Sequence, residues 1–251
     1  MQGVEYSSNN HTYMCPSCMD THIARPENGI NVCLGTSQLH DVHRPRDPDV
    51  TCPPDILHID WVTVSGGTIA DLEDAFLYDF AKQTRPMRIL ISAGLNDLAQ
   101  GVSVTDIIMR FIHLKETVDA QSRYHPSIKN ELVIATLLLP PKFIWFPDYG
   151  PAPPSHPNLL NEVTELNRWI VYYNKLSGKS TPRFSRFGVR EGHRELNDGS
   201  KVDFKTHRWN QWRQSERDSD KLHLNDYWRV RMAGAVARHF QAELERYGRI
   251  G

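Results

Sequence analysis

Three residue types that together can transfer an acyl group occur in two widely separated segments. Ser37 lies in LGTSQLHD, residues 34–41, directly after an apolar run, so its hydroxyl is expected where a strand ends. Asp220 and His223 are three residues apart in DSDKLHLND, a spacing that brings carboxylate and imidazole to one side of a helical turn or tight loop. The carboxylate can orient the imidazole, which accepts the serine proton as a general base. This pattern predicts nucleophilic catalysis; the alternative for Ser37 is an ordinary turn or N-cap residue.

Two further segments offer hydrogen-bond donors for the negative charge that develops on an attacked carbonyl oxygen. Residues 64–72, VSGGTIADL, contain adjacent glycines, which permit positive φ and close approach of a substrate to a backbone N–H. Residues 91–98, ISAGLNDL, contain Asn96, whose side-chain amide can donate to the same oxygen. Both segments also fit plain strand-to-helix turns, in which Asn96 and Asp97 are turn formers.

The elements that must position these segments alternate between apolar runs and helical patterns. The expected strands are INVCLG, ILHIDWVTV, MRILISAG and ELVIATLLL, and their nearly continuous apolar character is typical of strands covered on both faces. Between them lie IADLEDAFLYDFAKQ and VTDIIMRFIHLKETVDAQ, with apolar residues at helical spacing. The alternation predicts an α/β fold with a parallel sheet between helices.

The flanking parts of the chain are less regular. A Pro-rich segment, 140–157, follows the fourth expected strand, where α/β folds carry ligand-facing loops; its aromatic residues line a pocket or pack the loop onto the body. Helices are expected at 158–176 and 227–247, with RFSRFGV, 183–189, as a candidate last strand. Residues 1–29 are polar and turn-rich, so we expect an irregular N-terminal arm and then one domain, 30–251.

In its four chemistry-bearing segments the chain resembles the SGNH hydrolase superfamily, also called GDSL-like esterases, over residues 30–240. The matching blocks are GTS (35–37), SGG (65–67), GLND (94–97) and DKLHL (220–224). The resemblance implies Ser37 as the nucleophile, His223 as the general base and Asp220 as its orienting partner. It therefore implies a serine esterase that needs no cofactor for catalysis and acts on an acyl or acetyl ester of a small molecule, lipid or sugar.

The resemblance also implies an oxyanion hole formed by the Ser37 backbone, the Gly66 N–H and the Asn96 amide. Gly66 is preferred to Gly67 because the family's donor glycine precedes its usual Asp, whose place Gly67 takes here. A second departure is Thr36, which stands where the family's nucleophile block usually has Asp, a residue outside the chemistry. The implied fold is a three-layer α/β/α sandwich with a five-stranded parallel sheet and flavodoxin-like topology, and with the site at the carboxyl ends of the strands.

His40 is a rival for the role of general base because it lies three residues from Ser37. It lacks an orienting carboxylate in a matching motif, since Asp41 adjoins it and side chains of neighbouring residues normally point apart. We therefore expect a surface or helix-cap role for His40 and for His43 and His58.

The N-terminal arm contains residues at the spacing of zinc ligands. Cys15, Cys18 and His22 form a C-x-x-C-x-x-x-H pattern, in which the C-x-x-C turn places two thiolates on one metal. The candidates for a fourth ligand are Cys33, Cys52, His11 and His40. Cys33 lies inside the first expected strand and is expected to be a buried core residue, so the prediction is a structural zinc site without an assigned fourth ligand.

Composition leaves two classes of function open. The 251 residues include 29 Lys+Arg and 30 Asp+Glu, a formal charge of −1, which indicates neither a polyanion nor a membrane surface. We expect a cytoplasmic protein without a membrane span, because the apolar runs are short and cysteines are few. Residues 179–213 nevertheless hold nine Lys+Arg against four Asp+Glu, interleaved with aromatics. The alternative is therefore a non-catalytic or mobile-element-derived module with this fold that binds nucleic acid. A nucleotide-binding domain is disfavoured because no phosphate-binding glycine motif occurs.

Overall fold

The computed structural model shows a parallel sheet between two layers of helices. It describes residues 29–36, 39, 58–80, 82–83, 85–123, 130–138, 159–184, 189–195, 201–207 and 226–248, with the backbone alone for 160, 189–195, 201–207, 226–228 and 243–248. The sheet has the order β2–β1–β3–β4, and all three pairings are parallel. Its strands are β1 (Ile30–Gly35), β2 (Ile59–Thr63), β3 (Met87–Ser92) and β4 (Glu131–Ile134). The order is that of the flavodoxin-like topology, as predicted.

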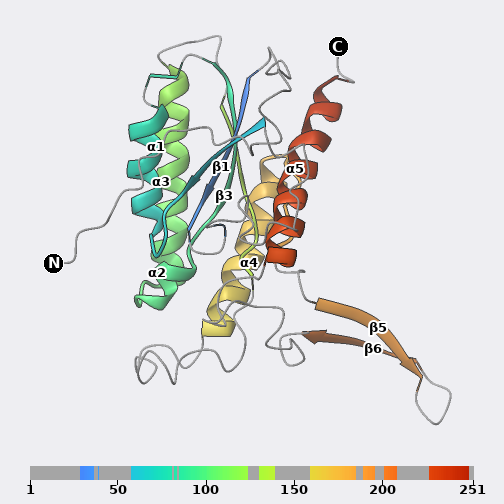
Figure 1. Cartoon of the computed structure of the whole chain (residues 1–251). Coiled ribbons are helices and arrows are strands. Elements are labelled where there is room, and N and C mark those ends of the chain that lie inside the picture. Colours follow the sequence, from blue (N-terminus) through green and yellow to red (C-terminus); the bar gives the residue numbers. More distant parts are fainter. Residues whose placement is uncertain are drawn as a thin grey trace.

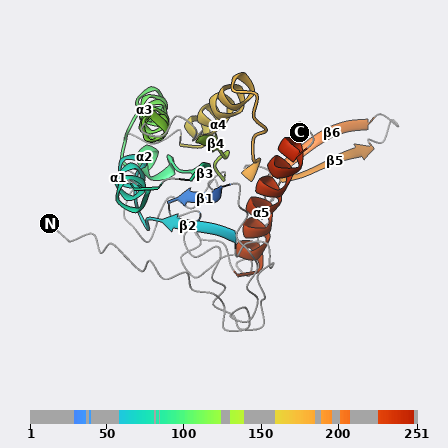
Figure 2. The same ribbon diagram turned by 90° about the horizontal axis from the view of Figure 1, so that it is seen from above.

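The helices cover both faces of this sheet (Figures 1 and 2). One layer contains α1 (Ile69–Phe80) and α3 (Val104–Arg123), and the other contains α4 (Leu159–Leu176) and α5 (Asp226–Gly248). The short helix α2 (Leu95–Ala99) follows the carboxyl end of β3. The three-layer sandwich is therefore confirmed, and the helices expected at 158–176 and 227–247 are present within a residue or so of the expected bounds.

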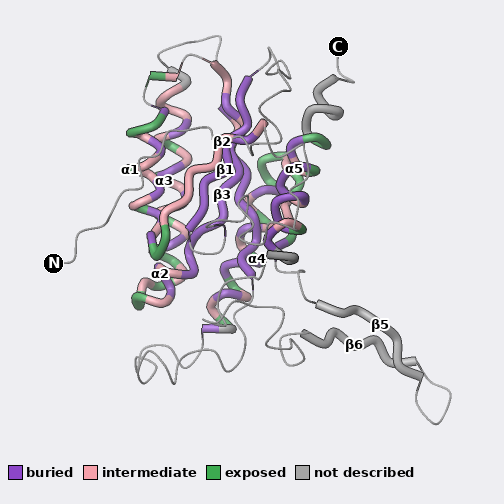
Figure 3. Tube along the Cα trace, viewed as in Figure 1, coloured by how far each residue is buried: buried purple, intermediate pink, exposed green. Residues whose placement is uncertain are grey.

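The core follows the apolar runs of the sequence (Figure 3). All six residues of β1 are buried, and in α1 the buried side chains are Ile69, Leu72, Phe76 and Phe80, one face of the helix. Cys33 is fully buried within β1, as predicted, and this burial raises the pKa of its thiol. Cys33 is therefore part of the hydrophobic core. Within the described residues, no helix is both long and apolar enough to cross a membrane.

The outer edge of β4 is paired with other parts of the chain, which explains why the described sheet has four strands where five were predicted. The Ala135 N–H donates to Ile91 O of β3 (2.7 Å), so the alternate residues Ile134 and Thr136 turn their backbone groups outward. The Asn174 amide accepts from Ile134 N (3.2 Å) and donates to Ile134 O (2.7 Å), and Pro182 O accepts from Thr136 N (3.0 Å). A helix side chain and an irregular segment thus satisfy the backbone groups that a fifth strand would have paired.

The last part of the chain before α5 contains a separate ribbon. Strands β5 (Val189–Glu195) and β6 (Lys201–His207) form a two-stranded antiparallel sheet that stands apart from the sandwich in both views (Figures 1 and 2). The run 183–189 was predicted to be the last strand of the main sheet, and this is wrong for its described residues. Phe184 is buried in the core beside the β4 edge segment, and Val189 begins β5.

Candidate functional site

The predicted site residues divide into two groups. Gly66 and Asn96 belong to the described part of the chain, whereas Ser37, Asp220 and His223 lie outside it. The geometry below therefore concerns the two oxyanion segments and the strand ends that carry them, and the triad remains a prediction.

The carboxyl ends of β1, β2 and β3 meet at one edge of the sheet. Gly35, the last residue of β1, is in register with Thr63 of β2 and with Ser92 of β3. Beyond the strands, Val64 N donates to Gly35 O (2.9 Å) and Thr36 N donates to Ser92 O (3.2 Å). From β1 the chain continues to β2 on one side, and after β2 it crosses back through α1 to β3 on the other side of β1. This edge is therefore the topological switch point at which open α/β sheets bind ligands.

The glycine segment forms a tight turn directly after β2. Gly67 N donates to Val64 O (3.2 Å), and Gly66 has φ +68°, a left-handed conformation that suits glycine. Gly66 is exposed and nothing lies within 4 Å of the position of an added Cβ, whereas a Cβ on Gly67 would lie 2.6 Å from Val64 Cγ1. Gly67 is thus a packing glycine whose N–H is used inside the turn, and Gly66 is the glycine that presents its backbone at the surface.

Asn96 lies in the first turn of α2 and reaches this loop. The segment enters α2 through Gly94, whose φ of +107° allows the sharp change of direction from β3. The half-buried Asn96 side chain donates from Nδ2 to Gly67 O at 2.7 Å. This bond joins the two segments predicted to supply the oxyanion donors, although they are 29 residues apart in the chain.

Asp97 adjoins Asn96 in α2 and is a residue that sequence reasoning treated only as a turn former. Its carboxylate is fully buried and accepts from Ile69 N at the start of α1 (3.2 and 3.4 Å) and from Arg110 Nη1 of α3 (2.7 Å). Burial raises the pKa of Asp97, and the bonds from Arg110 and Ile69 oppose that rise. The sequence does not distinguish a turn-forming Asp from a buried Asp in a loop. The available signal for a buried acidic partner was Arg110, a charged residue among the buried Ile107, Phe111 and Leu114 of one helix.

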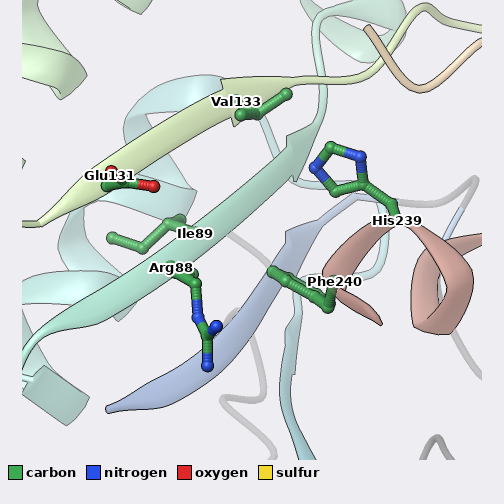
Figure 4. Close-up of a pocket in the computed structure, with 6 residues that line it drawn as sticks. All are labelled: Arg88, Ile89, Glu131, Val133, His239 and Phe240. Carbon is green, nitrogen blue, oxygen red and sulfur yellow. The ribbon is translucent and has the colours of Figure 1, made fainter. Parts of the chain in front are cut away.

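A small hollow in the described structure lies away from this edge (Figure 4). Its lining residues come from β3, β4 and α5: Arg88, Ile89, Glu131, Val133, His239 and Phe240. The space available to the centres of water molecules is about 10 Å³, which is about what one water molecule needs. The hollow is therefore too small for an ester substrate.

Several other predictions lie outside the described residues. These are the zinc candidates Cys15, Cys18 and His22, the alternative ligands His11, His40 and Cys52, and the Pro-rich segment 140–157. Within the described ranges, no group of three or more His, Cys, Asp or Glu side chains is arranged to hold a metal ion. Zinc binding by the arm stays a prediction, which a metal assay on protein purified without added zinc tests.

Comparison with known proteins identifies the fold through structure and not through sequence. No protein-family model and no curated protein matches the chain. Among solved structures, a GDSL-like lipase from Bacteroides thetaiotaomicron is similar at a TM-score of 0.58 and 15% identity, with 90% of this chain and 93% of that chain covered. A member of the lipolytic G-D-S-L family from Veillonella parvula has a TM-score of 0.51 and 13% identity, covering 84% and 97%. An acetyl xylan esterase has a TM-score of 0.51 and 12% identity, covering 82% and 97%.

These neighbours cover nearly the whole of both chains, so the likeness extends to the complete sandwich and not to one βαβ unit. Identities of 12–15% establish the fold alone. The chain therefore has an SGNH hydrolase-like fold, as its four motifs predicted.

Proposed function

We propose that the protein is a serine esterase that hydrolyses an acyl or acetyl ester at the carboxyl edge of the sheet. The observation that carries the proposal is the hydrogen bond from Asn96 Nδ2 to Gly67 O, which joins the amide segment to the glycine turn. The proposal is further supported by the fold, whose structural neighbours include lipases and an acetyl xylan esterase.

In the proposed reaction, Ser37 Oγ attacks the acyl carbon while His223 takes the hydroxyl proton, and Asp220 orients the imidazole. The carbonyl oxygen becomes an oxyanion that accepts hydrogen bonds from the Ser37 and Gly66 N–H groups and from the Asn96 amide. Collapse of the tetrahedral intermediate breaks the ester C–O bond, and the imidazolium returns the proton to the departing alcohol. Water then attacks the acyl-serine with the same base and releases the acid.

The turn that contains Gly66 would orient the backbone N–H that the proposed reaction uses. A hydrogen-bond donor stabilises a developing charge best when it is oriented before the reaction, because no reorganisation is then required. The Gly67 N–H to Val64 O bond and the Asn96 to Gly67 bond hold the turn on both sides of Gly67. Gly66 therefore belongs to a loop whose geometry is set by hydrogen bonds already in place.

The direct test is hydrolysis of a short-chain chromogenic ester by the wild-type chain and by Ser37→Ala, with folding of both checked by circular dichroism. We expect turnover by the wild type and a loss of about a thousandfold or more in kcat for Ser37→Ala. Equal rates for two folded proteins would contradict the assigned nucleophile.

A nucleic-acid-binding module is the second candidate, and the β5–β6 ribbon is the observation that favours it. This ribbon, residues 189–207, lies within the basic segment 179–213 and stands apart from the sandwich (Figure 1). It holds four Lys+Arg and four Asp+Glu, so the basic excess of the segment lies in the residues that flank the ribbon. Two-stranded ribbons fit the major groove of duplex DNA. Binding of oligonucleotides that weakens steeply with added salt would support this function, and absence of binding at low salt would exclude it.

A further inference from the structure

Two adjacent residues of α2 hold the junction between the glycine turn and α1 from both sides. Asn96 Nδ2 donates to Gly67 O (2.7 Å), and the Asp97 carboxylate accepts from Ile69 N (3.2 and 3.4 Å). Between these two backbone atoms lies Thr68, which with Asp71 caps the first turn of α1. The position of the turn relative to α2 therefore depends on the Asp97 side chain as well as on Asn96.

Asp97 itself is fixed by its own contacts. Its backbone oxygen accepts from Gln100 N (3.1 Å) and Val102 N (3.0 Å), which close α2 onto the loop before α3. Arg110 Nη1 lies 2.7 Å from Asp97 Oδ1, and the Arg110 side chain is 39% exposed while that of Asp97 is fully buried. The carboxylate thus links three elements, α1 through Ile69, α2 through its own backbone and α3 through Arg110.

Stability alone does not account for this arrangement. Transfer of a carboxylate from water into a protein interior is costly, and a buried ion pair is often no more stabilising than an apolar pair of similar volume. The carboxylate does supply a directional acceptor for a helix N–H, which an apolar side chain does not. This directional bond falls two residues after the turn that presents Gly66.

We propose that Asp97, held by Arg110, is a positioning residue that sets the glycine turn relative to Asn96 and so aligns the two oxyanion donors. The inference rests on the proposed esterase function. Neither residue needs to touch the substrate; the pair acts through the placement of the Gly66 N–H and the Asn96 amide.

The activity test uses the full chain and a short-chain chromogenic ester. Arg110→Met removes the cation, and we expect kcat to fall on the order of 10- to 100-fold with KM within about twofold, because donors misplaced by about 1 Å stabilise the transition state less while substrate binding is retained. Arg110→Lys, which can still donate to Asp97 Oδ1, is expected to keep kcat within about threefold of wild type. The matched control is Lys115→Met on the same helix, which removes a cation from a surface pair with Asp119 and is expected to leave kcat and KM unchanged.

A second variant keeps the test decisive if Arg110→Met does not fold. Asp97→Asn removes the buried charge and leaves the Arg110 cation, whose side chain is 39% exposed, to be solvated by water. The amide offers one acceptor oxygen in place of two. We expect kcat to fall on the order of tenfold with KM unchanged. An unchanged kcat in a folded Arg110→Met or Asp97→Asn protein, or an equal loss in Lys115→Met, would overturn the positioning role.

Amide hydrogen exchange supplies a readout that does not require activity. Exchange in the peptide covering residues 64–72 is expected to be faster in Arg110→Met than in wild type, and unchanged in Lys115→Met. If wild type hydrolyses no ester but this difference is found, the hydrolase proposal fails and the structural role of the pair stands. Unchanged exchange in Arg110→Met would overturn that role whatever the activity.

Discussion

Asparagine side chains bond to the backbone in two regions of the molecule, with different consequences. At β4 and in the segment just beyond it, Asn174 and Asn167 each accept from and donate to the backbone of one residue, Ile134 and Leu137 respectively, and both asparagines are buried. At the carboxyl ends of the strands, the half-buried Asn96 donates to a carbonyl in a turn that presents an exposed glycine. The Asn174 bonds take the place of a fifth strand, the Asn167 bonds hold the segment after β4, and the Asn96 bond fixes a loop at the carboxyl edge of the sheet.

Substitution of the two kinds of asparagine separates catalysis from stability. Asn96→Ala is expected to lower kcat by about 10²–10³-fold, because one oxyanion donor is removed and the glycine turn loses its anchor. The free energy of unfolding should fall by only about 1 kcal/mol, since the lost bond is partly exposed. Ester hydrolysis and urea denaturation of the same preparation measure both quantities, and a loss of stability with full activity would break the comparison.

The reverse result is expected at the β4 edge. Asn174→Ala leaves the buried N–H and C=O of Ile134 without their partner, which should cost about 2–4 kcal/mol of unfolding free energy. The variant should retain wild-type kcat per folded molecule below its unfolding transition. A tenfold loss of kcat in folded Asn174→Ala would show that the β4 edge is coupled to the site.

A matched pair of glycines sharpens the assignment of the Gly66 N–H. Gly66 and Gly178 have nearly the same positive φ, +68° and +67°, and neither has an atom within 4 Å of an added Cβ. Alanine at either position should therefore cost about 1–2 kcal/mol through backbone strain alone. Only Gly66→Ala should also lower kcat, about tenfold, and equal kcat values for the two variants would remove Gly66 from the site.

The smallest expected effect concerns the pH dependence of stability. The pKa of Asp97 is raised in the folded state, so the protonated carboxyl is favoured there. The stabilisation that this raised pKa adds to the folded state is fully present below the unfolded pKa of about 3.9 and is lost as pH rises through the folded pKa. Asp97→Asn should remove this decline in stability above pH 4. Urea denaturation of wild type and variant at several pH values measures it, and parallel curves would contradict the raised pKa.

The sequence predicted the sandwich well because its strands and helices differ in hydrophobic period. It also predicted that Gly66 and Asn96 belong to one site, because motifs that follow parallel strands meet at one sheet edge. It did not reveal the closed edge of β4, since Asn174 in a helix reads as a polar surface residue. The available signal was that Asn167 and Asn174, seven residues apart, share the helix face of Val163, Leu166 and Ile170.

The buried contacts of Asp97 could also not be predicted from the sequence pattern. Its partners Ile69 and Arg110 are 28 and 13 residues away and belong to different helices. Loop Asp residues are common, and only the packing of α1 and α3 over the end of β3 buries this one. Such contacts depend on tertiary structure, which the local periodicity of the sequence does not predict.

Covalent labelling tests the central claim most directly. The wild-type chain is treated with a serine-directed phosphonate, and the adduct is located by mass spectrometry, with Ser37→Ala as the control. The account predicts one adduct per chain, on Ser37, slower to form in Asn96→Ala and absent from Ser37→Ala. A folded wild-type chain that remains unmodified, or that is modified at a different residue, would contradict it.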